Sequence, residues 1–226
     1  YAPVLDINTN PQNPIIGNRS YGEDPYRVAE KGVALMQGHH DAGILTSGKH
    51  FPGHGDTAND SHKTLPTVDF DRSRLEKIEI LPFKKAIEQG LSSVMTAHLN
   101  IPALTSSNEP TSLSHAVVTE LLKQKIGFNG LAVTDALNMK GAEPIDSDTN
   151  MDLLALLAGN DVLLISKDIP LGIESIKNAY EKLPIVKLRV EESVKKILKA
   201  KYKVGLSQKP KVDIQNLYQG LNTRTD

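Results

Sequence analysis

The sequence of 226 residues contains no cysteine and no tryptophan, and aromatic residues make up only 4% of it. The absence of cysteine excludes disulfide bonds and thiolate metal sites, but it leaves the compartment open. No apolar run approaches the roughly 20 residues that a transmembrane helix requires. What is missing therefore argues against a disulfide-bonded scaffold, a thiolate metal centre and a membrane-spanning protein.

An excess of positive charge is missing too. The chain carries 26 Lys and Arg against 27 Asp and Glu, a formal net charge of -1, and the basic residues are spread along it. Binding to duplex nucleic acid requires a concentrated basic face, so this distribution argues against nucleic acid as the main partner. The ordinary apolar and charged fractions indicate a single globular domain with one large core.

The two ends of the sequence differ from its middle. Residues 1–6 lack the basic start and apolar stretch of a signal peptide, and they read as a strand that leads straight into a loop. We therefore expect a further segment to precede them. Residues 207–226 are polar and irregular, which is typical of a linker that leaves a domain. The predicted organisation is a domain over residues 1–206 and a tail or linker over residues 207–226.

Short apolar runs alternate with longer stretches of helical periodicity, which is the pattern of βα units around a parallel sheet. The predicted strands are Pro3–Ile7, Gly43–Lys49, Ser93–Ala97, Gly130–Thr134 and Asp161–Ile165. The predicted helices are Pro25–Asp41, Arg72–Gln89, Ser114–Ile126, Met151–Ala158, Ile169–Lys182 and Arg189–Lys203. Most of the strands carry unbroken Val, Ile or Leu, which indicates burial on both faces of the sheet.

Polar residues stand at the end of nearly every predicted strand. They are Asp6, Lys49-His50, His98, Asp135 and Ser166-Lys167. A barrel collects functional side chains from many successive strand ends on one face, whereas an open sheet concentrates them at one switch point. The predicted units are too few to close eight strands, which typically takes about 250 residues. We therefore predict an α/β fold of the TIM-type (β/α)8 barrel class, incomplete at the N-terminus in this chain.

The densest group of reactive side chains is the run KHFPGHGDT at residues 49–57, followed by Asp60, Ser61 and His62. Its proline and glycines predict a long loop after a strand. A solvated surface loop and a metal site are alternatives, but the histidines lack helical ligand spacing and no HExxH pattern occurs. The favoured interpretation is acid/base chemistry, because Asp60 and His62 alternate across Ser61 and can point the same way. A carboxylate beside an imidazole prepares it to deliver a proton.

Two further segments place polar side chains on the same predicted face. An apolar strand delivers Asp135 at its carboxyl end, where barrel chemistry takes place. An Asp that caps the next helix is the alternative, and taken alone it would be the better one. The loop after the first strand, which follows Asp6, carries Arg19. Its guanidinium could donate to substrate hydroxyls or an amide carbonyl, or it could be tied to Glu23 or Asp24 as structural support.

Residues 2–24, 49–62 and 130–139 together resemble glycoside hydrolase family 3, and most closely its bacterial β-N-acetylglucosaminidase branch. The combination of KHFPGHGDT with Asp-Ser-His is highly specific for that branch, and the resemblance extends from residue 1 to about residue 206. It implies a retaining exo-β-N-acetylglucosaminidase, with Asp135 as the nucleophile and His62, paired with Asp60, as the general acid/base. The two-carboxylate scheme usual for retaining glycosidases would not apply.

The resemblance also implies a substrate and a set of binding residues. The residues that we expect to hold the sugar are Arg19, Lys49, His50, Asp6 and His54. The expected partner is a small carbohydrate, a muropeptide-like fragment that contains N-acetylglucosamine, and the low aromatic content suits such a short substrate. No cofactor and no metal are expected. A fused C-terminal domain would follow the linker, and the compartment is either the bacterial cytoplasm or the cell envelope.

Three alternatives to the hydrolase stay open on the sequence. A family 3 β-glucosidase should lack the Asp-Ser-His element and draw its acid from another domain. A catalytically inactive barrel could bind peptidoglycan sugars or act as a scaffold, although the candidate catalytic residues are all present. In a phosphorylase, phosphate would replace water as the acceptor, and a neutral imidazole would repel that anion less than a carboxylate would.

Overall fold

The structure, a computed structural model, describes residues 1–57, 64–105, 109–143, 149–208, 214–215 and 217–218. Its centre is a parallel sheet with the strand order β1 (Ser47–Phe51), β2 (Ser93–Thr96) and β3 (Leu131–Thr134). Ser93 pairs with the first residue of both neighbouring strands, so the three strands begin at the same level. Their carboxyl ends therefore lie along one edge of the sheet.

Two further segments extend the sheet on its outer sides without forming full strands. Val4 makes a parallel bridge to Lys49 in β1, and Val162 makes one to Val133 in β3. The predicted strands that contain Val4 and Val162 are thus reduced to single bridges within the described residues. Among the described residues, each of these segments pairs with one strand, so it takes ladder hydrogen bonds from one side.

The sheet is open rather than closed. Within the described part of the chain, the two outer segments pair with β1 and β3 and not with each other. The prediction of an α/β fold with parallel strands is confirmed, whereas closure into a barrel is not observed in this chain. Five parallel segments are too few to close a sheet that needs eight.

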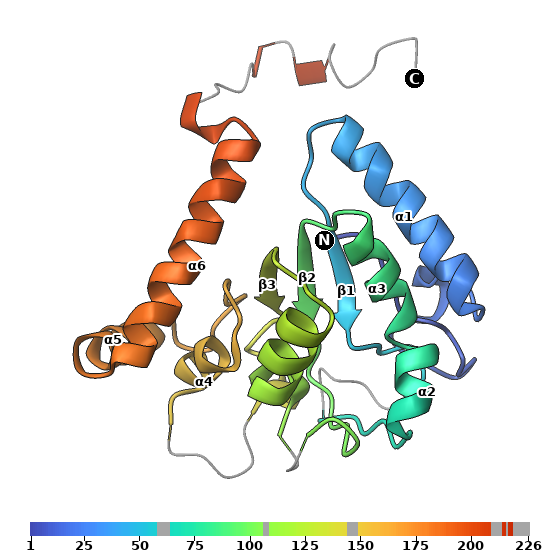
Figure 1. The fold of residues 1–226 in the computed structure, drawn as a ribbon, viewed down its shortest axis with the longest axis horizontal. Coiled ribbons are helices and arrows are strands. Elements are labelled where there is room, and N and C mark those ends of the chain that lie inside the picture. Colours follow the sequence, from blue (N-terminus) through green and yellow to red (C-terminus); the bar gives the residue numbers. More distant parts are fainter. Residues whose placement is uncertain (58–63, 106–108, 144–148, 209–213, 216, 219–226) are drawn as a thin grey trace.

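The helices of the first half lie on one side of the strands (Figure 1). The first is α1 (Pro25–Asp41), and the Asp24 side chain caps it by accepting a hydrogen bond from the backbone amide of Arg27. The long helix predicted next is wrong as a continuous element, because it divides into α2 (Arg72–Lys77) and α3 (Leu81–Glu88). Pro82 has no amide proton and fits only the first turn of a helix, so the chain restarts there.

The second half contributes η3 (Ala116–Lys125), α4 (Met151–Ala158), α5 (Ile169–Lys182) and α6 (Pro184–Lys203). The predicted bounds of α4 and α5 are confirmed, while α6 begins earlier than predicted because Pro184 is accommodated in its first turn. The predicted helix at η3 is present, but it is wound as a π-helix. Short 3-10 turns occupy Gly17–Arg19, Thr111–Leu113, Lys140–Ala142 and Leu206–Gln208. Among the helices described, none is long and apolar enough to cross a membrane.

The main hydrophobic core lies between the sheet and the helices α1, α3 and η3. The rings of Phe51 and Phe83 meet edge to face at 5.3 Å near its middle. Other fully buried members are Leu5, Met36, Leu75, Val94 and Leu122. Burying a side chain of this size contributes about 1.5–3 kcal/mol, so this cluster is the principal support of the sheet.

A buried charged cluster joins α6 to the amino end of the last β segment. The Asp161 carboxylate lies 2.8 Å from Arg189, 3.3 Å from Lys123 and 3.5 Å from Lys196. Burial alone would raise the pKa of Asp161, but these cations hold it below its usual range. Burial lowers the pKa of Lys123 to about 8. The cluster holds α6 at the end of the sheet opposite the carboxyl ends of the strands.

Candidate active site

The polar residues predicted at the strand ends gather along the carboxyl edge of the sheet. Asp6 follows the outer segment beside β1, His50 stands near the end of β1, and Asp135 directly follows β3. Electrostatic interactions also connect these positions, because the charge of Asp135 acts to raise the pKa of both Lys49 and His54. The structure therefore brings residues from three separate parts of the sequence into one polar cluster.

Asp6 is the buried centre of this cluster. One carboxylate oxygen accepts hydrogen bonds from the amides of His50 (3.0 Å) and His54 (2.8 Å), and the other lies 2.6 Å from His50 Nδ1. Burial by itself would raise the pKa of Asp6, but the charge and hydrogen bond of His50 hold it below its usual range. An ionised carboxylate only accepts, so His50 Nδ1 carries a proton and Nε2 is left for a substrate.

His54 is held by a contact within its own loop and by a hydrogen bond from the segment that follows Asp6. Its Nδ1 lies 2.7 Å from Thr57 Oγ1, and Asn13 Nδ2 donates to its backbone carbonyl at 2.9 Å. Burial lowers the pKa of His54, although the charge of Asp6 opposes this. A Cβ at Gly55 would lie 1.8 Å from the carbonyl oxygen of Ile7. Only glycine therefore lets the loop approach the backbone of Ile7 this closely.

Glu79 lies behind the same loop. Its side chain is 5% exposed and its Oε1 lies 3.5 Å from Arg74 Nε. Burial raises the pKa of Glu79, and the charge of Asp56 adds to the effect. A Cβ at Gly53 would stand 2.8 Å from the Glu79 Cβ, so Glu79 packs directly under the loop backbone. Its position therefore supports the backbone of the loop at Gly53.

Asp135 is half-buried and does not cap a helix. Its amide donates to the Thr96 carbonyl at 2.9 Å, and its Oδ1 accepts a hydrogen bond from the Ala136 amide at 2.8 Å. The residues after it form turns and then the short 3-10 turn at 140–142. The helix-cap alternative is therefore wrong, because the hydrogen bond that the carboxylate accepts comes from the adjacent residue outside any helix.

Lys49 and Arg19 supply positive charge beside the two carboxylates. Burial lowers the pKa of Lys49, and the nearby Arg19 charge adds to this, while Asp135 and Asp6 act in the opposite direction. Arg19 is exposed, and its Nε donates to the Ile15 carbonyl at 3.0 Å. Among the described residues it makes no ion pair with the acidic residues at 23 and 24. The guanidinium is thus available at the edge of the cluster.

His98 is a member of the cluster to which the sequence interpretation gave no role. It is 1% exposed, and its Nε2 and Nδ1 lie 3.1 Å from the Ala136 carbonyl oxygen and 2.6 Å from Ser112 Oγ. Burial lowers the pKa of His98, and the charge of Asp135 opposes this. Its place after a strand was a signal, but no motif distinguished it from an ordinary core histidine.

Asp60 and His62 lie outside the described residues. Among the residues that are described, no group of three or more His, Asp or Glu side chains is arranged to hold a metal ion. The described cluster places carboxylates, imidazoles and cations along one edge of the sheet, and side chains of these kinds can serve acid/base and nucleophilic chemistry.

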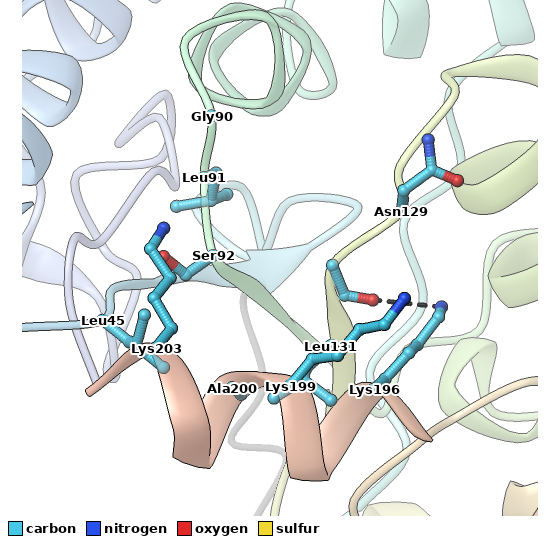
Figure 2. A pocket seen from close by; sticks show the side chains of 11 residues that line it. Leu45, Gly90, Leu91, Ser92, Asn129, Leu131, Lys196, Lys199, Ala200 and Lys203 are labelled. Carbon is cyan, nitrogen blue, oxygen red and sulfur yellow. Dashed lines mark hydrogen bonds between the residues drawn. The ribbon is translucent and has the colours of Figure 1, made fainter. Parts of the chain in front are cut away.

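A separate pocket of about 290 Å³ lies at the opposite end of the sheet (Figure 2). It is lined by residues that precede the strands, such as Leu45, Ser92 and Gly130, and by Lys196 and other lysines of α6. Lys196 donates to the Gly130 carbonyl at 3.2 Å across it. Its lining, within the described part of the chain, contains no carboxylate or imidazole, so it lacks the groups that the polar cluster provides.

Comparison with known proteins agrees with this geometry. The family model described as "Glycosyl hydrolase family 3 N terminal domain" matches residues 1–200. Beta-hexosaminidase A of Pseudoalteromonas piscicida is 38% identical over 176 residues, which cover 73% of this chain and 29% of that protein. Beta-hexosaminidase of Chromobacterium violaceum is 36% identical over 165 residues, which cover 73% of this chain and 45% of that protein.

A solved structure gives the same result in three dimensions. The glycoside hydrolase family 3 beta-N-acetylglucosaminidase from a Paenibacillus species matches with a TM-score of 0.88 at 38% identity. The match covers 95% of this chain and 41% of that protein. The chain thus spans less than half the length of each of these three relatives.

Proposed function

The chain belongs to glycosyl hydrolase family 3, and from this premise we propose that it forms the catalytic part of a retaining exo-β-N-acetylglucosaminidase. Relatives named beta-hexosaminidase and beta-N-acetylglucosaminidase support terminal β-linked N-acetylglucosamine as the sugar. The proposed substrate is a short peptidoglycan-derived fragment that ends in this sugar. The observation that carries the proposal is the Asp135 carboxylate directly after β3, whose charge acts on Lys49 and His54 at the same edge of the sheet as the Asp6–His50 pair.

Asp135 is the proposed nucleophile. One of its carboxylate oxygens attacks the anomeric carbon, and the bond from that carbon to the leaving-group oxygen breaks. A covalent glycosyl-enzyme forms, and the difficult substitution is divided into two easier ones. The half-buried position of Asp135 and its hydrogen bond from the Ala136 amide support this role, because a held carboxylate loses little freedom on reaching the transition state.

His62, paired with Asp60, is the proposed general acid/base. The imidazolium gives its proton to the leaving oxygen in the first step, and the neutral ring takes a proton from water in the second. That water attacks the anomeric carbon and releases Asp135. The Asp-Ser-His motif supports the assignment, and it follows a loop in which His54 and Thr57 already lie against the polar cluster.

The remaining predicted residues form the proposed sugar subsite. His50 presents Nε2 while Asp6 holds its Nδ1, so the ring reaches a sugar hydroxyl in one defined orientation. Lys49 and Arg19 offer donors to the outer hydroxyls, and His54 lies beside His50 with a ring-centroid separation of 6.0 Å.

We propose two further points about the organisation of the protein. The open sheet over residues 1–206 is part of a TIM-type (β/α)8 barrel, and residues 207–226 link it to a further domain. The structural match at a TM-score of 0.88 to a longer relative supports the first point. Eight strands bring functional side chains together on one face, where the described strands already place theirs.

The experiment measures release of p-nitrophenol from its β-N-acetylglucosaminide and its β-glucoside, with the natural protein that contains this chain. We expect hydrolysis of the acetamido sugar, its loss in Asp135→Ala, and a decrease of about 10²-fold or more in His62→Ala. Asp69→Ala is the matched control, because Asp69 is an exposed acid that is not one of the residues assigned to the site. Azide should restore turnover to Asp135→Gly and yield the α-configured glycosyl azide, since a small anion can enter the vacated space.

Each alternative has its own result in this assay. Preference for the glucoside would identify a β-glucosidase, and turnover that requires phosphate and forms a sugar phosphate would identify a phosphorylase. A folded protein that binds N-acetylglucosamine without turnover would be an inactive sugar-binding barrel. Full activity in Asp135→Ala would refute the assignment of the nucleophile.

A further inference from the structure

A chain of buried hydrogen bonds leads from α4 through His98 to the backbone carbonyl of Ala136, the residue after Asp135. The His98 Nε2 faces the Ala136 carbonyl at 3.1 Å, and a carbonyl can only accept, so Nε2 carries the proton. The Nδ1 of the neutral ring then accepts from the Ser112 hydroxyl, 2.6 Å away. Both ring nitrogens are therefore used, and the tautomer is defined by its partners.

Asn160 fixes the turn that presents Ser112. It is fully buried, and its Nδ2 donates to the carbonyls of Ser112 and Ala155, both at 2.8 Å. Its Oδ1 accepts a hydrogen bond from Thr96 Oγ1 at 2.9 Å. Because every polar atom of the amide has a partner of the right kind, the orientation of Asn160 is determined by the network. Asn160 thus fixes the position of Ser112, and Ser112 in turn fixes the His98 ring.

The same network holds the segment that carries Asp135. The Asp135 amide donates to the Thr96 carbonyl, and the Ala136 amide donates to Asp135 Oδ1 at 2.8 Å. His98 then holds the carbonyl of Ala136. The two successive residues are therefore restrained at three points, one of which is the carboxylate itself.

We infer that His98 is a positioning residue, which as a neutral imidazole holds the Ala136 carbonyl and so sets the direction of the Asp135 carboxylate. The inference rests on the proposed function, because it takes Asp135 as the nucleophile. The neutral state suits this role, since a cation at His98 would pair with the nearby carboxylate and weaken its attack on carbon. Burial keeps the pKa of His98 low and opposes such a cation.

Two substitutions separate the hydrogen bond from the volume of the ring. In His98→Gln, an amide nitrogen can occupy the place of Nε2 and donate to the Ala136 carbonyl, whereas His98→Leu fills the space without a donor. His40→Leu is the matched control, because the His40 ring also makes hydrogen-bond contacts, to the hydroxyls of Thr46 and Ser92 at 3.0 Å, but at the opposite end of the sheet. All variants are made in the natural protein that contains this chain.

We expect His98→Leu to lower kcat on p-nitrophenyl β-N-acetylglucosaminide about 10²-fold, the loss typical of a misplaced reacting group. Its KM and its inhibition constant for N-acetylglucosamine should stay within about threefold of the parent, because the ground-state contacts are kept. His98→Gln should retain kcat to within about tenfold, and His40→Leu should match the parent, because neither change removes the donor to the Ala136 carbonyl.

The outcomes that overturn the inference differ from those that overturn the proposed function. If Asp135→Ala is inactive and His98→Leu keeps the parent kcat, or His98→Gln is as impaired as His98→Leu, the positioning role is refuted and the nucleophile stands. A parent without turnover refutes the proposed function and the inference with it. Should His98→Leu fail to fold, imidazole nitrogen chemical shifts decide in the parent, where a proton on Nδ1 at neutral pH would refute the role.

Discussion

Replacement of Asp6 tests the geometry of the polar cluster most directly. The carboxylate is fully buried and accepts three hydrogen bonds, from the amides of His50 and His54 and from the His50 ring. Asp6→Ala removes the acceptor and leaves three buried donors without a partner. Asp6→Asn keeps an oxygen for the two amides but turns an amide nitrogen toward His50 Nδ1, so two donors face each other.

The magnitude follows from these contacts. A buried donor left without a partner costs about 1–3 kcal/mol, and removing one member of a buried charged pair costs about 3–5 kcal/mol. We expect Asp6→Ala to lower the free energy of unfolding by about 3–5 kcal/mol and Asp6→Asn by about 1–3 kcal/mol. The loss in Asp6→Ala is a large part of the 5–15 kcal/mol that holds a typical domain together.

Urea unfolding followed by circular dichroism measures both changes. With a slope of about 2 kcal/mol per molar urea, the midpoint of Asp6→Ala should fall by about 2 M. Asp71→Ala is the matched control, because Asp71 is an exposed carboxylate that accepts one amide hydrogen bond as a helix cap, and its loss costs about 1 kcal/mol. If both Asp6 variants unfold within about 0.5 kcal/mol of the parent, the three hydrogen bonds do not exist as described.

The Asp6 carboxylate should also make the free energy of unfolding depend on pH under acidic conditions. The pKa of Asp6 in the folded protein lies below its ordinary value of 3.8, because the His50 interactions outweigh the effect of burial. The folded state therefore binds fewer protons than the unfolded state near that pH, and the stability that Asp6 contributes is present above pH 3.8. It is lost as the pH falls through the lower folded pKa. The unfolding free energy of Asp6→Asn should show less of this loss than that of the parent.

Two other predictions concern packing and charge. Gly55→Ala should cost about 1–3 kcal/mol in unfolding experiments, because its Cβ would overlap the Ile7 carbonyl, while Gly38→Ala in the open face of α1 should stabilise by about 0.5–1 kcal/mol. Equal effects of the two would contradict the close approach of the loop. Lys123 has a folded pKa of about 8 against an ordinary 10.5, so the unfolded state binds more protons between these values. The stability of the parent relative to Lys123→Met should therefore rise across that range, by at most about 3 kcal/mol, and a fall would show that Lys123 is not buried against Asp161.

The elements that the sequence predicted best are those whose signals are local. Residues 25–41, 151–158 and 169–182 form helices with the predicted bounds, because each has a capping residue before its first turn and a regular apolar spacing. The helix predicted over 72–89 was wrong as one piece because apolar periodicity continues across the break. The two outer β segments were predicted as longer strands than the structure has, because a run of Val and Leu does not show how many strands pair with it.

The polar cluster was predictable in part. The strand-end positions of Asp6, His50 and Asp135 were apparent because the carboxyl ends of parallel strands share one edge. His98 was visible at such an end, but its role depends on partners at positions 112 and 136, which only the folded chain brings together. The functional roles of the cluster, and those of the dyad at 60 and 62, stay predictions for the assays above.

The sequence by itself determined the family and the α/β class and nominated the candidate catalytic side chains, because these reside in residue types, spacings and local periodicity. Tertiary structure alone decided that the Asp6 carboxylate accepts from two histidines 44 and 48 positions away, and that His98 holds the residue after Asp135. The physical reason is that hydrogen-bond partners, burial and the resulting pKa values depend on distances in space. Local sequence preferences carry no information about those distances until the sheet aligns its strands.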